Sequence, residues 1–246
     1  PSIAFYLFKE TNLLSYIFPE VDIMPGIEII DGHGHKDVFI HTLQVVDNAA
    51  QLSDKMEIRF AALVHDIAKP NTKRFFEDKG WTFHGHEEIG RRMMVDIAKR
   101  LRLSNDLRDY LMRMIKLHLR PIALAKEGVT DTAIRRIMNE AGDDIDDLMT
   151  LCRADITTKN PTKVRKYMKN FESVEELMKD VKLRDEMKKF QSPVRGHEIM
   201  KIFNLSEGPE VGRIKGIIEE AILDGDVPND YDSVYSYIIK NRDSLI

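Results

Sequence analysis

The sequence contains a single cysteine, Cys152, among its 246 residues. One thiol cannot form an internal disulfide, so a cytoplasmic, reducing compartment is the natural expectation. No apolar run approaches the about 20 residues that a bilayer-spanning helix needs, so no membrane partner is predicted. The chain also lacks an excess of positive charge. Its formal net charge of −4 and pI of about 6.1 give no global basic field that would indicate nucleic acid.

Helical periodicity is the main signal in what the sequence does contain. The chain is 43% hydrophobic and 32% charged, which suits a soluble globular protein with one large helical domain and a smaller appendage. Apolar residues recur at i, i+3 and i+4 through most of the chain. This spacing predicts a mostly all-α protein, with helices at 2–17, 38–52, 56–68, 86–101, 104–119, 130–141, 144–158, 162–190, 195–203, 209–223 and 231–241.

Two segments break the helical pattern. Residues 24–37 contain glycine and proline and are predicted to form a loop. Residues 72–84 place aromatic and β-branched side chains on both sides of Asp78-Lys79-Gly80, which predicts a short hairpin or structured loop. The sequence therefore predicts three regions: a connecting helix and loop (1–34), a main helical domain (35–160), and a helical linker and tail (161–246).

Six polar side chains occur on or beside apolar helical stretches where the pattern predicts core: His41, His65, Asp66, His86, His118 and Asp155. Burying such groups is costly unless each is hydrogen-bonded or bound to a metal. A lone histidine on an apolar face is more often a satisfied core residue, but six together favour a shared site. Imidazole and carboxylate are ligands that Mn, Fe, Co, Ni and Zn accept and that Mg partly accepts. The pattern therefore predicts one or two divalent metal ions.

The order His … His-Asp … His … His … Asp resembles the HD superfamily of metal-dependent phosphohydrolases over about residues 35–160. The resemblance implies four core metal ligands, His41, His65, Asp66 and Asp155. It also implies that His86 and His118 serve a second metal position. A carboxylate such as Asp66 can bridge two metals, and two metals together lower the pKa of a shared water and clamp a phosphoryl oxygen. The histidines at 33, 35, 84 and 197 match no ligand position and are expected to be solvated or to cap helices.

Two cations are candidates for contact with a substrate phosphate. Lys69, in the stretch HDIAKP, matches the lysine that such enzymes aim at phosphate, so it joins Asp66 as a candidate catalytic residue. Arg120 follows His118 closely and could pair with phosphate in a bidentate manner. Both side chains could equally be ordinary charges near the end of a helix.

A narrower resemblance comes from the flanking segments, which are similar to the tRNA nucleotidyltransferase and poly(A) polymerase family, the CCA-adding enzymes. It rests on DVFIHTL, HDIAKP, FHGHEEIG and RLRL, on the opening LLSYIFPEVDIMPGI, and on the tail RGHEIMKIFNLSEGPEVGRIKGIIEEAILDGDVPN. In that family a head domain with a Gly-Ser strand and an Asp-x-Asp pair transfers nucleotides. The Asp-x-Asp pairs here begin at 144, 224 and 230, at helix starts or in polar turns, with no Gly-Ser strand. Nucleotidyl transfer is therefore not expected from this chain, which resembles the region after the head.

A basic run at 159–170 contains no acid. Its Lys163, Arg165 and Lys166, next to Tyr167, could follow an RNA backbone, or they could form a solvated helix face. Two functions follow from the sequence. The first is a divalent-metal phosphohydrolase that acts on nucleotides or RNA 3′ ends. The alternative is a non-catalytic tRNA-binding body of a CCA-adding enzyme, with a vestigial or structural metal site.

Overall fold

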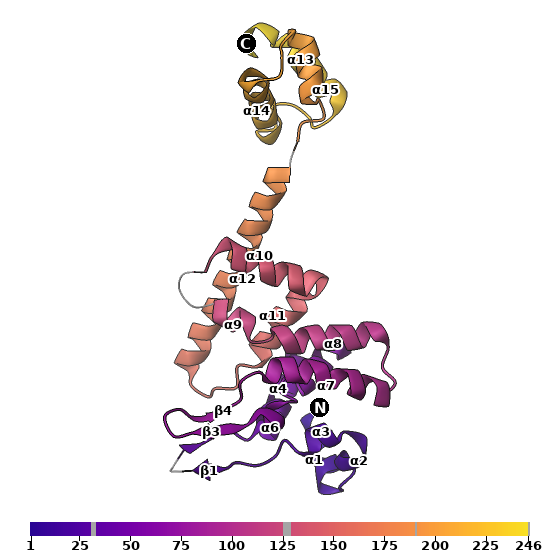
Figure 1. The fold of residues 1–246 in the computed structure, drawn as a ribbon, viewed down its shortest axis with the longest axis vertical. Coiled ribbons are helices and arrows are strands. Elements are labelled where there is room, and N and C mark those ends of the chain that lie inside the picture. The colour runs from indigo at the N-terminus through magenta and orange to yellow at the C-terminus, as the bar shows by residue number, and fades with distance from the viewer. Residues whose placement is uncertain (31–32, 125–128, 190, 246) are drawn as a thin grey trace. The chain divides into compact units, whose positions relative to one another are not determined.

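The computed structural model describes residues 1–30, 33–124, 129–189 and 191–245 and confirms the predicted all-α class (Figure 1). The chain divides into two compact units, Pro1–Val181 and Lys182–Ile246. In the part of the chain that the structure describes, no helix has both the length and the apolar character that a bilayer crossing requires.

The first unit consists of helices with two small antiparallel ribbons. Its helices before the hairpin are α1 (Ser2–Glu10), α2 (Leu14–Ile17), α3 (Pro19–Asp22), α4 (Val38–Leu52), α5 (Met56–Val64) and α6 (Lys69–Thr72). They are followed by α7 (His86–Arg100), α8 (Asn105–Leu117), α9 (Arg120–Leu124), α10 (Asp131–Ala141), the 3₁₀ turn η1 (Gly142–Asp144), α11 (Ile145–Ala154) and the part of α12 (Pro161–Lys189) that ends at Val181. The strands are β1 (Ile29–Ile30), β2 (His33–Gly34), β3 (Arg74–Phe76) and β4 (Gly80–Thr82).

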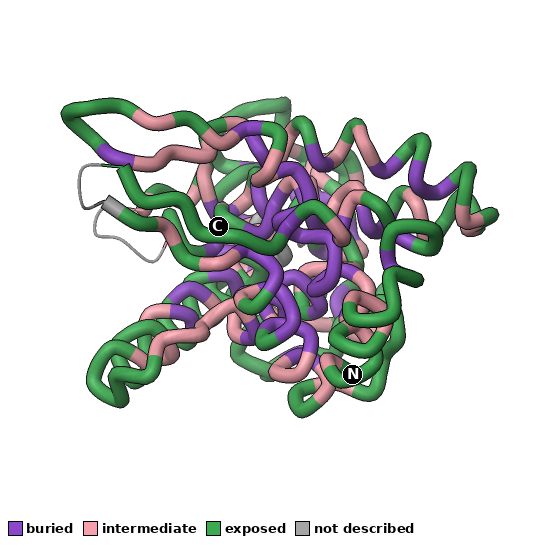
Figure 2. The backbone as a smooth tube through the Cα atoms, turned by 90° about the horizontal axis from the view of Figure 1, so that it is seen from below, coloured by how far each residue is buried: buried purple, intermediate pink, exposed green. Residues whose placement is uncertain are grey.

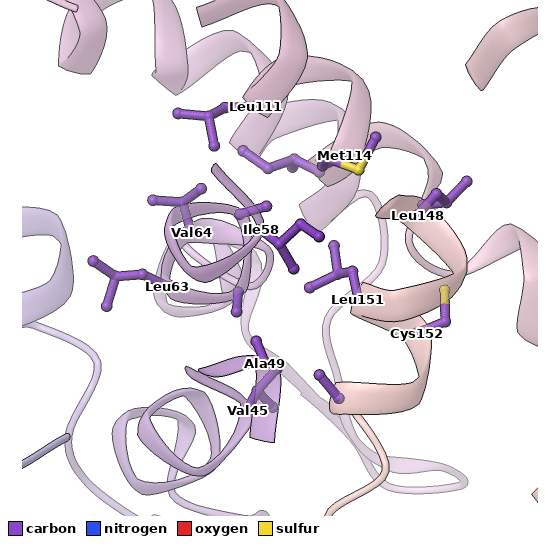
Figure 3. Packing of buried hydrophobic residues seen from close by; sticks show 14 of the residues in the cluster. Val45, Ala49, Ile58, Leu63, Val64, Leu111, Met114, Leu148, Leu151 and Cys152 are labelled. Atoms are coloured by element: carbon purple, nitrogen blue, oxygen red, sulfur yellow. The ribbon is translucent and has the colours of Figure 1, made fainter. Parts of the chain in front are cut away.

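The core of this unit forms where α4, α5, α8 and α11 meet. Figure 3 shows Val45, Ile58, Met114 and Leu151, one from each of these helices, pointing toward one another. Small residues on α5, such as Ala61, are fully buried and let the neighbouring helices approach closely. Burying such apolar area contributes roughly 25 cal/mol per Å², which makes this packing the main support of the helix ends that carry the site.

The contact between α7 and α8 depends on a glycine. A Cβ placed on Gly90 would lie 3.0 Å from Cγ2 of Ile115 and 3.4 Å from Cγ2 of Ile67, closer than packed carbons normally approach. Figure 2 shows how buried backbone, in purple, alternates with exposed backbone, in green, along the helices. The close packing of α7 on α8 brings their candidate ligands, His86 and His118, to the same side of the core.

Several boundaries differ from the predicted ones. The predicted helix 2–17 is broken at Asn12, which has a φ of 57°, and continues as the short α2. The apolar spacing does not register this interruption, because both pieces present their apolar side chains to the same core. The predicted loop 24–37 contains the two-residue strands β1 and β2. The predicted hairpin is confirmed, with Phe75 of β3 paired opposite Trp81 of β4.

The second unit has a core of its own. Its helices are α13 (Gly196–Phe203), α14 (Pro209–Leu223), α15 (Tyr231–Lys240) and α16 (Arg242–Leu245), as the apolar spacing predicted for the first three. Buried side chains at Ile199, Ile214 and Val234, one from each of α13, α14 and α15, pack together. The first part of α12 belongs to the first unit, where Phe171 and Val174 join its core.

Candidate metal centre

The six candidate ligands lie at helix ends rather than in helix interiors. His65, His118 and Asp155 are the residues directly after the last residues of α5, α8 and α11. His86 is the first residue of α7, and His41 lies in the first turn of α4. The C-terminal end of a helix carries a partial negative charge, which favours a cation. Three helix C-termini and two helix N-termini meet at this point, so the ends that favour a positive charge outnumber those that oppose it.

The local backbone explains why His65 and Asp66 are presented together. The predicted helix 56–68 is wrong at its end, because α5 stops at Val64. Beyond it the amide of Ile67 donates to the carbonyl of Val64 at 3.1 Å, and the amide of Lys69 donates to the carbonyl of Asp66 at 2.9 Å. These tighter turns redirect the chain within four residues. The apolar pattern missed the change, because Ile67 and its neighbours stay buried after the helix has ended.

Each candidate histidine is oriented through its Nδ1 atom. Nδ1 of His65, His86 and His118 lies 2.7–2.8 Å from the backbone carbonyl of the residue three positions earlier. A carbonyl can only accept, so Nδ1 carries the proton in each ring. This tautomer leaves Nε2 with a free lone pair, the arrangement that metal-binding histidines adopt. The fourth ring, His41, has its Nδ1 3.1 Å from the hydroxyl of Thr157.

One group of ligand atoms comprises His41, His65 and Asp155, whose atoms all lie within 4.8 Å of one another. Nε2 of His41 is 3.0 Å from Oδ1 of Asp155, and Nε2 of His65 is 3.7 Å from that oxygen. Oδ2 of Asp66 faces the same group, 3.5 Å from Nε2 of His41 and 3.2 Å from Nε2 of His65. Two imidazoles and two carboxylates therefore surround one position.

A second group comprises Asp66, His86 and His118, also within 4.8 Å of one another. Here Oδ1 of Asp66 is 3.2 Å from Nε2 of His86 and 3.7 Å from Nε2 of His118. The two imidazole nitrogens are 3.4 Å apart. Asp66 thus offers one carboxylate oxygen to each group, and its carboxylate lies between two candidate metal positions.

The charges of the cluster are strongly coupled. Burial opposes the charge on Asp66, but the neighbouring His65 and the other imidazoles close to its carboxylate hold its pKa well below the usual range. Burial alone would lower the pKa of His41, but its hydrogen bonds with Asp155 and Asp66 raise it to about 9. Burial and the nearby His65 lower the pKa of His118 to about 4. The cluster therefore keeps ionised carboxylates next to imidazoles of very different basicity.

The donor set fits a divalent metal. Nε2 of His65 and Oδ1 of Asp66 are buried and have no hydrogen-bond partner among the residues that the structure describes. Because Nδ1 holds the proton, Nε2 of His65 and Oδ2 of Asp66 are two acceptors facing each other at 3.2 Å. A cation, either a proton or a metal ion, has to lie between such atoms for their burial to be tolerated. Imidazole and carboxylate together suit Mn, Fe, Co, Ni or Zn.

A cleft of about 320 Å³ opens on one side of the cluster. It is lined by Lys36, Val38, His41, Lys69, Phe83 and Asp155. The side chains of His41 and Asp155 are 14% and 18% exposed, whereas those of His65 and Asp66 are only 1% and 2% exposed. Access from solvent is therefore through the first group of ligands, and the second group lies behind it.

The structure brings Lys69 to the cluster but not Arg120. Nζ of Lys69 lies 2.5 Å from Oδ2 of Asp66, and the side chain lines the cleft. Arg120 instead donates to Oε1 of Glu140 at 2.6 Å, and Lys116 donates to the other oxygen of that carboxylate at 2.8 Å. Both cations line a different hollow. The prediction that Arg120 contacts substrate thus gains no support from its placement.

The candidate RNA-contacting residues and two of the histidines that match no ligand position lie on the surface. Lys163, Arg165 and Lys166 are exposed on α12, as are His84 before α7 and His197 on α13. The prediction for the side chain of His33 lies outside the described residues.

Sequence reasoning missed three residues of the site. Thr157, the partner of His41, lies two positions after Asp155 in a polar segment that gave no ligand signal. Lys36 and Phe83 line the cleft, each close in sequence to a predicted histidine. Each of the three lies within five positions of a candidate ligand, a proximity that many other residues share, so the sequence holds no signal that selects them.

Comparisons with known proteins agree with this geometry. The HD domain family matches residues 38–160, half of the chain. The multifunctional CCA protein of Tolumonas auensis is 33% identical over 135 residues, which cover 51% of this chain and 32% of that protein. The chain therefore spans only about a third of the length of this relative. The predicted resemblance is confirmed: the chain belongs to the HD domain family, which points to metal-dependent phosphohydrolase chemistry.

Proposed function

We propose that the protein is a divalent-metal-dependent phosphohydrolase that acts on nucleotides or RNA termini. The observation that carries this proposal is the position of Asp66. Its Oδ2 atom faces the first ligand group and its Oδ1 atom faces the second. The cluster lies at the base of an open cleft. A purely structural metal site is normally closed by its protein ligands, whereas a catalytic site keeps one position accessible.

In this proposal the protein holds two metal positions. His41, His65 and Asp155 hold the first, His86 and His118 hold the second, and Asp66 serves both. A divalent cation there would supply Lewis acidity to a phosphoryl oxygen and lower the pKa of water at neutral pH. The contribution of the chain is orientation. Carbonyl and hydroxyl partners fix the imidazole rings, so the ligand atoms are arranged before any ion or substrate binds.

The charges that line the cleft suit an anionic substrate. Lys69 and Lys36 both line the cleft, together with His41 and Asp155 of the accessible ligand group. A phosphate that entered between them would have its negative charge partly neutralised at the point where it meets the cluster. Lys69 already contacts Asp66, so it also helps to hold that carboxylate in place.

The substrate class rests on the similarity to a CCA protein over half of the chain. The name of that relative refers to the CCA end of tRNA, so a nucleotide or an RNA 3′ end is the corresponding substrate for this chain. A tRNA-binding body is a second candidate, because Lys163, Arg165 and Lys166 are exposed on α12 and form no ion pair with the described residues. The two functions can coexist on one chain.

Metal content and turnover test the proposal directly. Protein purified without chelator should carry divalent metal and should hydrolyse bis(4-nitrophenyl) phosphate or a 2′,3′-cyclic nucleotide in the presence of Mn, Ni, Co or Mg. A chelator should stop the reaction, and added metal should restore it. Absence of turnover with all four metals, in protein that retains its ligands and fold, would contradict a hydrolase and favour the binding body.

A further inference from the structure

A row of aromatic side chains leads from the β3–β4 hairpin to the cleft. Phe75 contacts Trp81, Trp81 contacts His35, and His35 contacts Phe83, each edge to face, with ring centroids 5.3, 5.4 and 5.7 Å apart. We call these four residues the aromatic strip. None of the four rings is fully buried. The strip ends at Phe83, the one of its members that lines the cleft.

The ring of Phe83 is held in a fixed relation to the candidate ligands. Its own carbonyl accepts from Nδ1 of His86 at 2.8 Å, so the backbone of Phe83 orients one ligand while its side chain faces the cleft. Gly85, with a φ of 77°, makes the turn that joins the two residues. On the other side, His35 is fixed by the amide of Glu28, which donates to its Nε2 at 3.3 Å. The contacts of Phe83 with His86 and His35 therefore hold the ring of Phe83 in place without substrate.

Positive charge lies next to this ring. Nζ of Lys69 is 5.7 Å from the centroid of Phe83 and 2.5 Å from Oδ2 of Asp66, so it connects the ring to the candidate metal ligands. Lys36 lines the same cleft, is exposed, and forms no ion pair with the residues that the structure describes. An aromatic surface flanked by cations is the combination that binds nucleotides irrespective of base, because every base has a face that can stack.

We infer that Phe83 is the residue that recognises the base of the substrate. The substrate is a nucleotide whose phosphate lies at the metal ligands between Lys36 and Lys69, and whose base stacks on Phe83. A cleft of about 320 Å³ is at the lower end of the roughly 300–1,000 Å³ of small-molecule sites, so it accommodates one terminal nucleotide rather than a length of strand. This inference rests on the proposed function and narrows its substrate class.

Steady-state kinetics with paired substrates test it. The first substrate is adenosine 2′,3′-cyclic phosphate. The second is glycerol 1,2-cyclic phosphate, which has the same cyclic phosphodiester but no base. Base stacking is worth about 1–3 kcal/mol, so Phe83→Leu should raise KM for the nucleotide between about 5-fold and 140-fold. The value of kcat should change little, since stacking acts in the ground and transition states alike. Both constants for the glycerol ester should stay the same.

A matched control lies on the same hairpin. Phe76 is 43% exposed and does not line the cleft, so Phe76→Leu removes an aromatic ring without touching the proposed base site. This variant should leave KM and kcat unchanged for both cyclic esters. Phe83→Tyr keeps the ring and should restore most of the selectivity for the nucleotide. Metal content and circular dichroism of Phe83→Leu should match those of the wild type, since its backbone contact with His86 does not require the ring.

Binding can be followed without turnover, because the chain contains a single tryptophan, Trp81, which belongs to the aromatic strip. Adenosine 3′-monophosphate should change its fluorescence, and Phe83→Leu should weaken the Kd by a factor similar to the change in KM. An unchanged KM and Kd in Phe83→Leu, or equal KM values of the wild type for both cyclic esters, would overturn the inference while the proposed hydrolase function stands. If neither ester nor bis(4-nitrophenyl) phosphate is hydrolysed with Mn, Ni, Co or Mg, the proposed function fails, and the fluorescence titration alone decides whether a nucleotide site exists.

Discussion

The two ligand groups of the centre share Asp66 but differ in access, and the pKa values of His41 in one and His118 in the other are shifted in opposite directions. The first group, with His41 and Asp155, opens to the cleft, and burial is outweighed there by two carboxylates that raise the pKa of His41 to about 9. The second group is more deeply buried, and burial and the nearby His65 lower the pKa of its His118 to about 4, whereas contact with Asp66 outweighs burial and raises the pKa of its His86. The surroundings thus make the histidine at 41 more basic and the histidine at 118 less basic than usual. The open group is suited to meet substrate, and the buried group is suited to hold the shared carboxylate in place.

The largest expected effect follows from the position of Asp66 between the groups. Asp66→Ala should abolish metal binding at both positions, whereas His118→Ala should remove only the ion of the buried group. The reason is that Asp66 alone offers an oxygen to each group. Metal analysis of the purified variants measures this, with Asp78→Ala, an exposed residue of the hairpin turn, as the control. Equal metal content in Asp66→Ala and wild type would show that the two groups do not depend on a shared carboxylate.

His41 of the first group and His118 of the second should also respond to pH in opposite directions in chelator-treated protein. The pKa of His41 lies above its ordinary value of 6.5, so its contribution to stability is complete below pH 6.5 and is lost as pH rises through about 9. The pKa of His118 lies below 6.5, so its contribution is present above pH 6.5 and is lost as pH falls through about 4. Each pKa shift changes the free energy of unfolding by at most on the order of 3 kcal/mol.

Denaturant unfolding between pH 4 and 10 measures both contributions by difference from the wild type. His41→Gln should lose the alkaline decline and keep the acid one. His118→Gln should do the reverse. Parallel pH profiles for the two variants would show that the surroundings of His41 and His118 are not electrostatically distinct.

A variant at Lys69 separates the holding of metal from contact with substrate. Lys69→Ala should lower turnover by on the order of 100-fold, because it removes a positive charge next to the reacting phosphate. Metal content should not fall, since the ammonium group is not a metal ligand. The exposed Lys79→Ala serves as the control for removal of a lysine. If the metal content falls together with activity, Lys69 acts through its contact with Asp66 rather than on substrate.

The smallest effect is expected at the exposed basic residues of α12, which belong to neither ligand group. Reversing Lys163, Arg165 and Lys166 to glutamate should weaken binding of labelled tRNA. It should also flatten the dependence of log K on log[salt] by about 0.9 for each phosphate that the variant no longer neutralises. These side chains are exposed, so the fold should be unaffected, and hydrolysis of a small phosphodiester should not change. Titrations at two salt concentrations measure the slope. Identical binding by wild type and the triple variant would identify this run as a solvated helix face.

Much of the fold was available from the sequence because helical spacing is a local property. The bounds of α4 were predicted correctly, and the hairpin was recognised from the turn residues Asp78-Lys79-Gly80. The interruption at Asn12 and the end of α5 at Val64 were not predicted. In both places buried apolar residues resume directly beyond the break, at Leu14 and at Ile67, so the apolar spacing carries no sign of the turn.

Residue types and their order along the chain were enough to predict a metal centre and its candidate ligands, because both can be read without knowing the fold. The pairing of individual atoms depended on tertiary packing. Packing places Oδ1 and Oδ2 of Asp66 toward different groups, brings Thr157 to His41, and pairs Arg120 with Glu140 outside the cleft. It also places Phe83 in the cleft at the end of the aromatic strip. These contacts join atoms of separate helix ends, and the packing of α4, α5, α7, α8 and α11 sets where those ends meet.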